Sequence, residues 1–583
     1  MKTKPIYLLV IGLLFITLSI NAQTTTIGGV INAYSPVVAI DTVPCLNKVA
    51  VTTGSNFAVG DTVLIIQMKG ANFDSTNSST FGSVVNINRA GNYEIARVTA
   101  ISTNTITLNG KLVNYYDVSG FVQLVRARNY INANVSSLLT CSPWNGQIGG
   151  VLVFNVVNTL SLGNDIDVTG KGFRPGIISN NPDGGCGAGS PGYYYPLTQS
   201  STSSWSSGGA EKGEGIGVLS PSKLAGRGPL VNGGGGGNKH NHGGGGGSNF
   251  TSGGLGGNSL VGCNQTNGGV GGVDLSSFYN SNKFFMGGGG GRGDDNNGVG
   301  SNGEYGGGII IISAGTINGN SRKMAANGNS VSVVAYGIAD GAGGGGAGGV
   351  IFLKTNSIAG TFTAMANGGT GGMQNPTYGC VGPGGGGGTG AILTSLSNLS
   401  TITTSLLPGG PGIVIAASLP CSNTSYGALA GASNTVGPLF NRNLIYTPNN
   451  VVNTLSITAS TQTACPGVSI TLTGSGAQSY TWLPGNVSSG SIVVTPTVTT
   501  NYTLLGSTGN CSTTAVKTIT VIPEPVIGIS SSTPGVCNGF SAALTVTGSL
   551  NYTWYPQNTG GSSVAVTPST SSFYTVIATS ASG

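Results

Sequence analysis

Short runs of apolar residues alternate with clusters of Gly and Asn through the middle of the chain, and one such unit recurs at a fixed spacing. The apolar runs Ile309–Ile312, Val350–Leu353 and Ala391–Leu393 each follow glycine and begin 41 residues apart, at positions 309, 350 and 391. An earlier copy begins at Gly149-Gly150 and continues into Val151–Phe154. Self-similarity at a fixed period is typical of a stacked repeat architecture.

Each copy holds three apolar segments separated by turn residues. In the second copy these are Ile309–Ile312, Thr316-Ile317 and Lys323–Ala326, and Asn327-Gly328 closes the unit. Short β-branched runs bounded by Gly and Asn predict strands, because these turn residues accept positive φ. A single unit cannot bury its apolar side alone, so the repeats predict the coils of a parallel β-helix.

Glycine tracts lie between the predicted coils, and their composition permits two interpretations. They are Gly233–Gly237, Gly243–Gly247, Gly287–Gly291, Gly343–Gly346 and Gly384–Gly388. Such tracts form flexible linkers or ordered three-fold helices like those of collagen, where only Gly fits. Regular spacing against the strands favours order for the later tracts, whereas the block from Phe173 to Tyr305 is less regular.

The ends of the chain carry different patterns. Alternating strands such as Tyr93–Ile101 and Thr105–Leu108 predict a small antiparallel barrel or sandwich that caps the stack. Near the other end, four residues recur 72 positions later: Cys465, Trp482, Pro496 and Tyr502 as Cys537, Trp554, Pro568 and Tyr574. A buried Trp and a late Tyr fit two immunoglobulin-like sandwiches. Cys511 lies nine residues after Tyr502, and nine after Tyr574 is Gly583, so we expect the second module to be truncated.

The first residues predict export. Lys2 and Lys4 precede an apolar run and then Asn21-Ala22-Gln23, which is the layout of a signal peptide cut after Ala22. Only 7% of residues are charged and 104 are glycine, and the Lys and Arg residues form no cluster. Nucleic acid is therefore not an expected partner, and the mature chain has no predicted membrane span.

The sequence thus predicts an all-β chain with five parts. These are a signal peptide (1–22), a small antiparallel β-barrel or sandwich (23–135), a glycine-rich parallel β-helix-like solenoid (136–453), and Ig-like modules at 454–522 and 526–583.

The chain has nine cysteines, and an exported chain with this many predicts disulfides. The repeat favours Cys465–Cys511, and chain order favours Cys45–Cys141 more weakly. The six cysteines before Cys465 allow 15 pairings, which the sequence leaves open.

Few residues suggest a chemical site, and we expect no catalytic site, metal or cofactor. His240 and His242 are interpreted as solvated loop residues, because a closed zinc site needs four ligands. Asp294-Asp295 lacks the spaced ligands of a calcium loop, and the tripeptide Arg292-Gly293-Asp294 is expected by chance in so glycine-rich a run. Asp165 and Asp167 form an alternating acidic pair that later copies lack, so they are interpreted as structural.

The Tyr-x-Trp segments at Tyr480–Trp482 and Tyr552–Trp554, followed by Thr-Pro-Thr or Thr-Pro-Ser, resemble the Ig/PKD-like repeats of large surface proteins from Bacteroidota. Such proteins are often cargo of type IX secretion or adhesins associated with gliding motility. The Asp-Phe-Gly-Asp signature of PKD repeats does not occur in this sequence, and no C-terminal sorting domain is visible in it. The resemblance implies a cell-surface location and contact with secretion machinery.

Three functions remain open at this point. The leading hypothesis is a non-enzymatic exported adhesin or matrix protein that binds an extracellular glycan or surface ligand. The alternative is a carbohydrate-active enzyme, a polysaccharide lyase or hydrolase, built on the β-helix. An ice- or mineral-binding face is disfavoured, because Thr169, Ala326 and Ala366 are predicted to be equivalent and form no uniform array.

Overall fold

The protein is described by a computed structural model that covers most of the chain. The described residues are 24–41, 48–178, 192–197, 208–238, 240–259, 268–295, 299–332, 335–337, 340–447, 455–508, 511–524, 526–548 and 551–579. The predicted signal peptide lies outside them. They form two compact units, the first holding the described residues up to 447 and the second those from 455 onward.

Nearly all regular structure in the described residues is β, which confirms the predicted fold class. The only helical segments among them are short 3-10 turns: η1 (Gly54–Asn56), η2 (Val118–Gly120), η3 (Pro221–Lys223) and η4 (Ser276–Ser281).

Six strands of the first unit form a closed antiparallel barrel: β2 (Tyr34–Ile40), β3 (Lys48–Val51), β4 (Thr62–Gln67), β7 (Tyr93–Ser102), β8 (Thr105–Leu108) and β9 (Val122–Tyr130). They pair in the order β2-β3-β8-β7-β4-β9, and β2 also pairs with β9, which closes the ring. Val63 and Ile65 are among the buried residues of its core. A small hairpin, β5 (Asn72–Phe73) and β6 (Val84–Asn86), extends from it. The predicted antiparallel domain is thus a barrel.

A parallel solenoid continues from the barrel. Its strands are β1 (Thr24–Val30), β10 (Asn132–Thr140), β11 (Val151–Leu162), β12 (Ile166–Asp167), β13 (Ile309–Asn318), β14 (Arg322–Ala325), β16 (Val350–Ala359), β17 (Phe362–Met365), β19 (Ala391–Thr394) and β20 (Ile402–Ser405). A separate parallel pair joins β15 (Ala335–Gly337) to β18 (Gln374–Pro376). The structure places β1 in the solenoid, where it pairs with β10, and not in the N-terminal domain to which the sequence assigned it.

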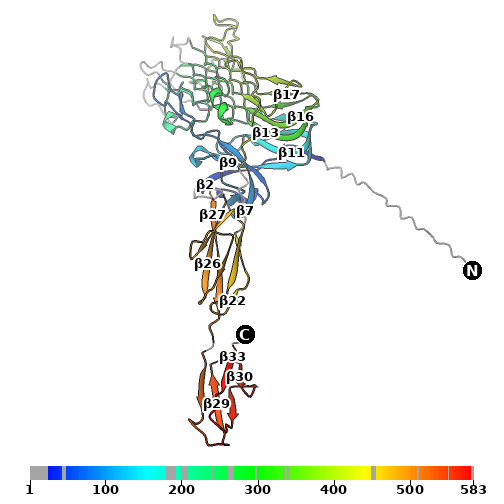
Figure 1. The fold of residues 1–583 in the computed structure, drawn as a ribbon. Helices are drawn as coiled ribbons and strands as arrows, with labels where there is room; N and C mark the ends of the chain where they lie inside the picture. Colours follow the sequence, from blue (N-terminus) through cyan, green and yellow to red (C-terminus); the bar gives the residue numbers. More distant parts are fainter. Residues whose placement is uncertain are drawn as a thin grey trace, which may run out of the picture. The chain divides into compact units, whose positions relative to one another are not determined.

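The repeated units lie on one another in register, as the 41-residue period predicted. Val151 pairs with Ile309, Ile309 with Val350, and Val350 with Ala391. Figure 1 shows the corresponding strands β11, β13 and β16 stacked. One register differs from the prediction, because Asp167 pairs with Ala325 and Thr169 is therefore level with Asn327 rather than with Ala326. Asn327 donates to the Thr169 hydroxyl and accepts from the N–H of Asn367, so a short bonded polar ladder runs along this corner.

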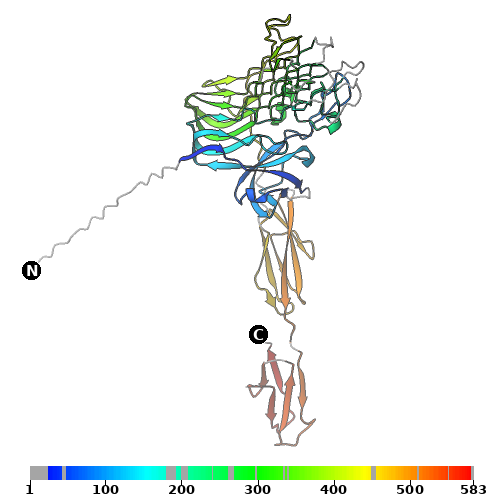
Figure 2. The same cartoon turned by 180° about the vertical axis from the view of Figure 1, so that it is seen from behind.

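The described glycine tracts are ordered and buried, which decides between the two interpretations. Figure 2 shows them, with the extended segments beside them that bond to them, as one lattice without strand arrows. In the tract 243–247, the N–H groups of Gly243 and Gly246 donate to residues 257 and 254, and those of Gly244 and Gly247 donate to 342 and 345. Donors three residues apart therefore point to the same neighbour, which is the repeat of a polyproline II helix.

This tract has six hydrogen-bonded neighbours. Its N–H groups donate to residues 254–257, 342–345 and 235, and its carbonyls accept from residues 269–272, 291 and 385–388. The packing leaves no room for a side chain: a Cβ on Gly244 would lie 2.1 Å from the carbonyl oxygen of Gly291. Glycine is required here because neighbouring backbones come into direct contact.

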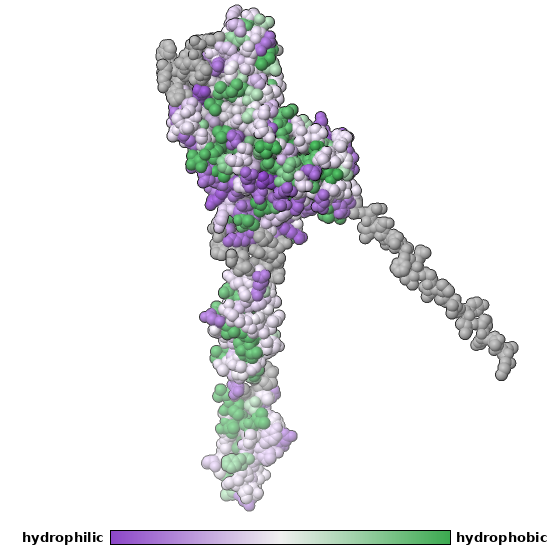
Figure 3. All heavy atoms as spheres, turned by 45° about the horizontal axis from the view of Figure 1, so that its top comes forward, coloured by the Kyte–Doolittle hydropathy of each residue, from purple (hydrophilic) through white to green (hydrophobic). Residues whose placement is uncertain are grey.

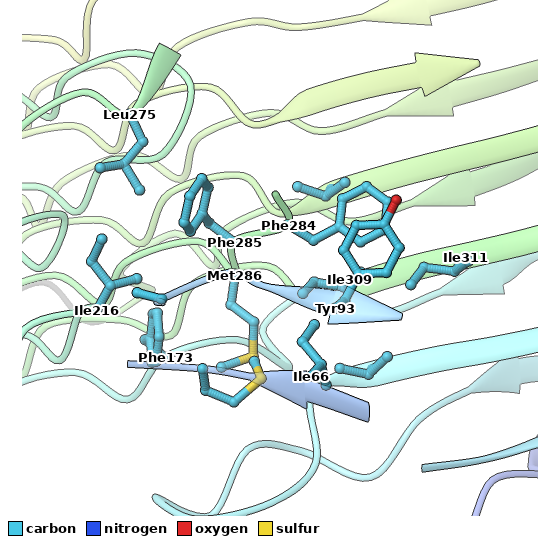
Figure 4. Close-up of a cluster of buried hydrophobic side chains, with 14 of the residues drawn as sticks. Ile66, Tyr93, Phe173, Ile216, Leu275, Phe284, Phe285, Met286, Ile309 and Ile311 are labelled. Atoms are coloured by element: carbon cyan, nitrogen blue, oxygen red, sulfur yellow. The ribbon is translucent and has the colours of Figure 1, made fainter. Parts of the chain in front are cut away.

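An apolar cluster joins the barrel, the lattice and the strands of the solenoid. Tyr93 from the barrel stacks on Phe284 from the lattice, with ring centroids 4.1 Å apart. Figure 4 shows these rings side by side, with Ile309 and Ile311 of β13 beside them. The segment after the last coil continues this connection, because Leu439 pairs with Leu393 of β19 and the N–H of Ile95 donates to Ile445.

The second unit contains two sandwiches. The first packs the sheet β21-β23-β25 against β22-β27-β26-β24, from the strands β21 (Ser456–Ala459), β22 (Thr463–Ala464), β23 (Ile470–Ser475), β24 (Ser479–Leu483), β25 (Ser491–Val494), β26 (Thr500–Thr508) and β27 (Cys511–Val521). The second has the sheets β28-β29-β32 and β31-β30-β33, from β28 (Gly528–Ser531), β29 (Ala542–Thr547), β30 (Asn551–Tyr555), β31 (Thr559–Gly560), β32 (Ser563–Val566) and β33 (Thr575–Thr579). Trp482 and Trp554 are buried and donate to the carbonyls of Ser489 and Gly561, which keeps the predicted 72-residue correspondence.

The predicted bridge Cys465–Cys511 is not formed, and the strand topology explains why. Cys465 is a free, exposed thiol. It follows β22, whose Ala464 pairs with Val521 at the end of β27, whereas Cys511 begins that strand. At roughly 3.3 Å per residue the two ends of β27 are about 30 Å apart, far beyond the reach of a disulfide.

Candidate ligand-binding cavity

A cavity of about 290 Å³ opens in the first unit where the barrel meets the lattice. The barrel side supplies Lys69 and Phe121, and the lattice supplies Arg174, Glu211 and Glu214 among others. The remaining lining residues are mostly apolar and include Pro175, Ile177, Val218, Leu219, Leu224, Leu230 and Tyr305. The cavity thus combines a few charged groups with extended apolar walls, which is the usual composition of a small-molecule site.

Glu214 is the centre of the charged groups. It forms ion pairs with Lys69 and with Arg174, whose Nε lies 3.0 Å from Oε2. The indole N–H of Trp144 also donates to Oε2 at 3.0 Å. Burial alone would raise the pKa of Glu214, but the charges of Lys69 and Arg174 outweigh burial and lower it. Glu214 is therefore an ionised carboxylate whose oxygens are already occupied.

Lys69 is held by more than its ion pair. Its ammonium lies 5.2 Å from the ring centroid of Phe121 and 5.6 Å from that of Phe173. These cation–π contacts fix a buried cation beside Glu214. The pair therefore forms a rigid wall of the cavity.

Glu211 differs from Glu214, although the two lie only three positions apart in the sequence. Burial raises the pKa of Glu211, even though the N–H groups of Ile177 and Ile178 donate to its Oε2 at 2.8 and 2.9 Å. No ion pair holds its carboxyl within the described part of the chain. Glu211 is the carboxyl of the cavity that remains open to a ligand or to a proton.

Partly exposed side chains form the rim. The side chain of Arg174 is 50% exposed, and Tyr305 and Val218 are 38% and 51% exposed. A guanidinium, a phenol and an aliphatic side chain are therefore the partly exposed groups of the lining. On the face of the molecule visible in Figure 3, apolar residues form several separate patches between polar residues.

Lys212 lines the cavity but has a structural role. Its ammonium donates to the carbonyls of Tyr193, Gly226 and Gly228, at 2.6 to 2.9 Å. It also lies 4.7 Å from the ring centroid of Phe81. All three of its N–H donors are used within the protein, so it binds lattice segments together.

The sequence missed this cavity, because its charged groups come from three distant parts of the chain. One signal was present: Glu211-Lys212-Gly213-Glu214 concentrates three charges in a chain of which only 7% is charged.

The cysteines that the sequence singled out do not form the favoured bridges. Cys141 is a free, buried thiol, and burial raises its pKa to about 12. It packs in the apolar core of the solenoid, so the predicted Cys45–Cys141 bridge is wrong; Cys45 lies outside the described residues. A disulfide joins Cys380 and Cys421 instead, with their Cα atoms 6.1 Å apart. This bridge occurs in three of the 15 three-bridge arrangements that the sequence left open.

Two of the other residues that the sequence singled out, His242 and Asp294, are buried. His242 is buried, which corrects its interpretation as a solvated residue, while His240 is half-buried. Asp294 is fully buried, so the Arg292–Asp294 tripeptide is not presented on the surface. Among the described residues no group of three or more His, Cys, Asp or Glu side chains is arranged to hold a metal ion.

Asp165 and Asp167 lie at β12 and do not line the cavity. The N–H of Lys323 donates to Asp165 at 2.9 Å, and that of Thr169 donates to Asp167 at 2.7 Å. Both carboxylates therefore bond to backbone, as their structural interpretation requires.

In the described part of the chain, no helix has the length and apolar character needed to cross a bilayer.

Comparison with known proteins yields distant structural matches. No family model matches the sequence, and no curated protein sequence matches it. The tailspike Gp54 of Acinetobacter baumannii bacteriophage AP22, solved with a capsular saccharide, matches at 11% identity and a TM-score of 0.13, over 78% of this chain and 70% of that one. The tailspike gp49 of Pseudomonas phage LKA1 matches at 11% identity and a TM-score of 0.14, over 93% and 79% of the two chains. At such low similarity these matches carry no argument about this chain.

Proposed function

We propose that the protein is an exported, non-enzymatic adhesin that binds an extracellular saccharide in the cavity beside Glu214. The Cys380–Cys421 disulfide supports an oxidising, extracellular location. The predicted signal peptide and the resemblance to surface proteins of Bacteroidota point the same way. In this proposal the Ig-like modules are spacers, and export uses the secretion machinery of such proteins.

The cavity supports a saccharide because it offers both kinds of contact that a sugar ring needs. Arg174 and Glu211 supply a charged donor and a carboxyl acceptor for hydroxyl groups. Tyr305 and the aliphatic walls supply surface for the C–H faces of the ring. These groups are fixed by the lattice, so binding requires little ordering of the site.

The state of Glu214 is the observation that favours binding over hydrolysis. Glycoside hydrolysis commonly requires two carboxyl groups, one of which donates a proton while the other acts as base or nucleophile. Glu214 accepts from Lys69, Arg174 and Trp144, and its pKa is lowered. Only Glu211 remains, which is one carboxyl short of the pair.

A hydrolase or lyase is the second candidate, because the raised pKa of Glu211 suits a general acid. A glycan array probed with the chain Gln23–Gly583, with product release followed in the same wells, separates the two. We expect saturable binding without new reducing ends or unsaturated sugars. Tyr305→Ala should weaken binding about tenfold, through the loss of one ring contact.

Tyr378→Ala is the matched control, because this tyrosine is 77% exposed and does not line the cavity. An equal loss of saccharide affinity in the Tyr305→Ala and Tyr378→Ala variants would exclude the cavity as the binding site. Product release that Glu211→Gln abolishes would overturn the non-enzymatic proposal.

A further inference from the structure

The first strand of the solenoid has an open edge. β1 pairs in parallel with β10 along one side, and no other strand of the described structure pairs with it. An open edge presents unpaired N–H and C=O groups to another extended chain. Thr24, Thr25 and Thr26 at its start are exposed, and the strand carries no charged residue that would block such pairing.

A groove of about 470 Å³ lies against this strand. Its lining includes residues of β1 and Ile31 and Asn32, which follow it. It also includes Arg126, Arg128, Asn129 and Tyr130 at the end of β9. An extended backbone bound to β1 would therefore lie beside two arginines.

The groove is electropositive. Its lining contains both arginines and no carboxylate. The ion pairs between described residues involve Lys69, Arg174 and Arg292, so neither groove arginine is neutralised in this way. Both arginines also act on Tyr130: burial raises the pKa of this phenol, and the positive charges of Arg128 and Arg126 partly offset the rise.

We propose that this groove binds an extended acidic segment of another protein, which adds as a strand to the open edge of β1. Main-chain hydrogen bonds to β1 would supply sequence-independent affinity, and Arg126 and Arg128 would select carboxylates in the added strand. A second copy of this chain fits poorly as the partner, because only 16 of its 583 residues are acidic.

The probe is a fluorescein-labelled octapeptide of alternating Glu and Val, measured by anisotropy against the chain Gln23–Gly583. We expect saturable binding that weakens with added salt, since the contacts are partly ionic. The double variant Arg126→Glu/Arg128→Glu should weaken it at least about tenfold. Hydrogen exchange of Thr24–Val30 should slow when the peptide is bound.

Lys111→Glu is the matched control, because this exposed lysine lies on the barrel away from the groove and should leave the affinity unchanged. Binding that survives the double charge reversal would overturn the proposal. Unchanged exchange of Thr24–Val30 on binding would overturn it as well. Concentration-dependent self-association that protects β1 would also overturn it, in favour of a second copy as the occupant.

Discussion

The strands of the solenoid and the glycine lattice belong to the same coils but are stabilised in different ways. In the strands, apolar side chains stack from coil to coil, and Ile310, Ile351 and Ile392 are all fully buried. In the glycine tracts of the lattice, the buried residues have no side chains, and backbone groups bond to as many as six neighbouring segments. Each coil passes from the lattice to the strands at the glycine before its first strand, such as Gly349 before Val350.

This difference changes what each region tolerates. Side-chain burial is worth about 25 cal/mol per Å² of apolar surface, so the strands depend on volume being filled. The lattice gains little from that source and depends on satisfied backbone hydrogen bonds at close approach. Alanine should therefore damage the two regions for opposite reasons, by leaving a cavity in one and by overfilling the other.

The largest effect is expected in the strands. Phe352 of β16 is 1% exposed, and its ring centroid lies 5.5 Å from that of Phe284. Phe352→Ala should lower the free energy of unfolding of the first unit by about 3–5 kcal/mol, because it removes buried surface and leaves a cavity. Urea unfolding followed by circular dichroism measures it, with exposed Tyr378→Ala as the control. A cost below about 1 kcal/mol would show that the lattice, and not the strands, dominates stability.

The lattice should be destabilised by an added side chain rather than by the removal of one. A Cβ on Gly344 would lie 2.1 Å from the carbonyl oxygen of Gly245 and 2.4 Å from its carbon. Gly344→Ala should therefore cost about 1–3 kcal/mol or more, although alanine favours folding by restricting the unfolded chain. The same unfolding experiment measures it.

Gly410→Ala is the matched control for the lattice. The nearest atom to a Cβ at Gly410 is Thr370 Cγ2, at 3.9 Å, so the added methyl group meets no backbone. We expect this variant to be neutral or slightly stabilising. If Gly344→Ala were equally neutral, the lattice would be looser than its hydrogen bonds indicate.

The strands could be predicted from the sequence because their information is local and periodic. A run such as Ile309–Ile312 predicts a strand by itself, and the 41-residue period predicts which strands are neighbours. The described disulfide follows the same 41-residue period, because Cys380 and Cys421 are 41 residues apart and lie on adjacent coils.

The lattice and the cavity depend on contacts that local patterns do not encode. Tract 243–247 bonds to segments from residue 235 to residue 388, and nothing in five glycines specifies these neighbours. In the cavity, Lys69, Arg174 and Glu214 are brought together by the same long-range packing. The Cys465–Cys511 prediction failed for a related reason, because the module repeat indicates the kind of fold but not which ends of its strands meet.

The last effect is the change of stability with pH, at the place where the barrel meets the lattice. The folded-state pKa of Glu214 is lowered, so its contribution to stability is present above the ordinary value near 4.5 and is lost as the pH falls through the lower folded value. Burial raises the pKa of Glu211 and of Glu304, so their contributions have the opposite sign and stability rises as the pH falls toward 4.5.

Calorimetry between pH 7 and pH 3 separates these contributions, if the transition that Phe352→Ala lowers is used to identify the first unit. Glu214→Gln should be less stable at pH 7, because it leaves Lys69 buried without its counter-ion, and it should show a shallower loss below about pH 4.5. Glu211→Gln should still lose stability below about pH 4.5, but its stability should rise less as the pH falls from 7 toward 4.5. Parallel pH profiles for Glu214→Gln and the natural chain would mean that the ion pair does not stabilise this junction, and that backbone bonding and apolar packing alone join the two regions.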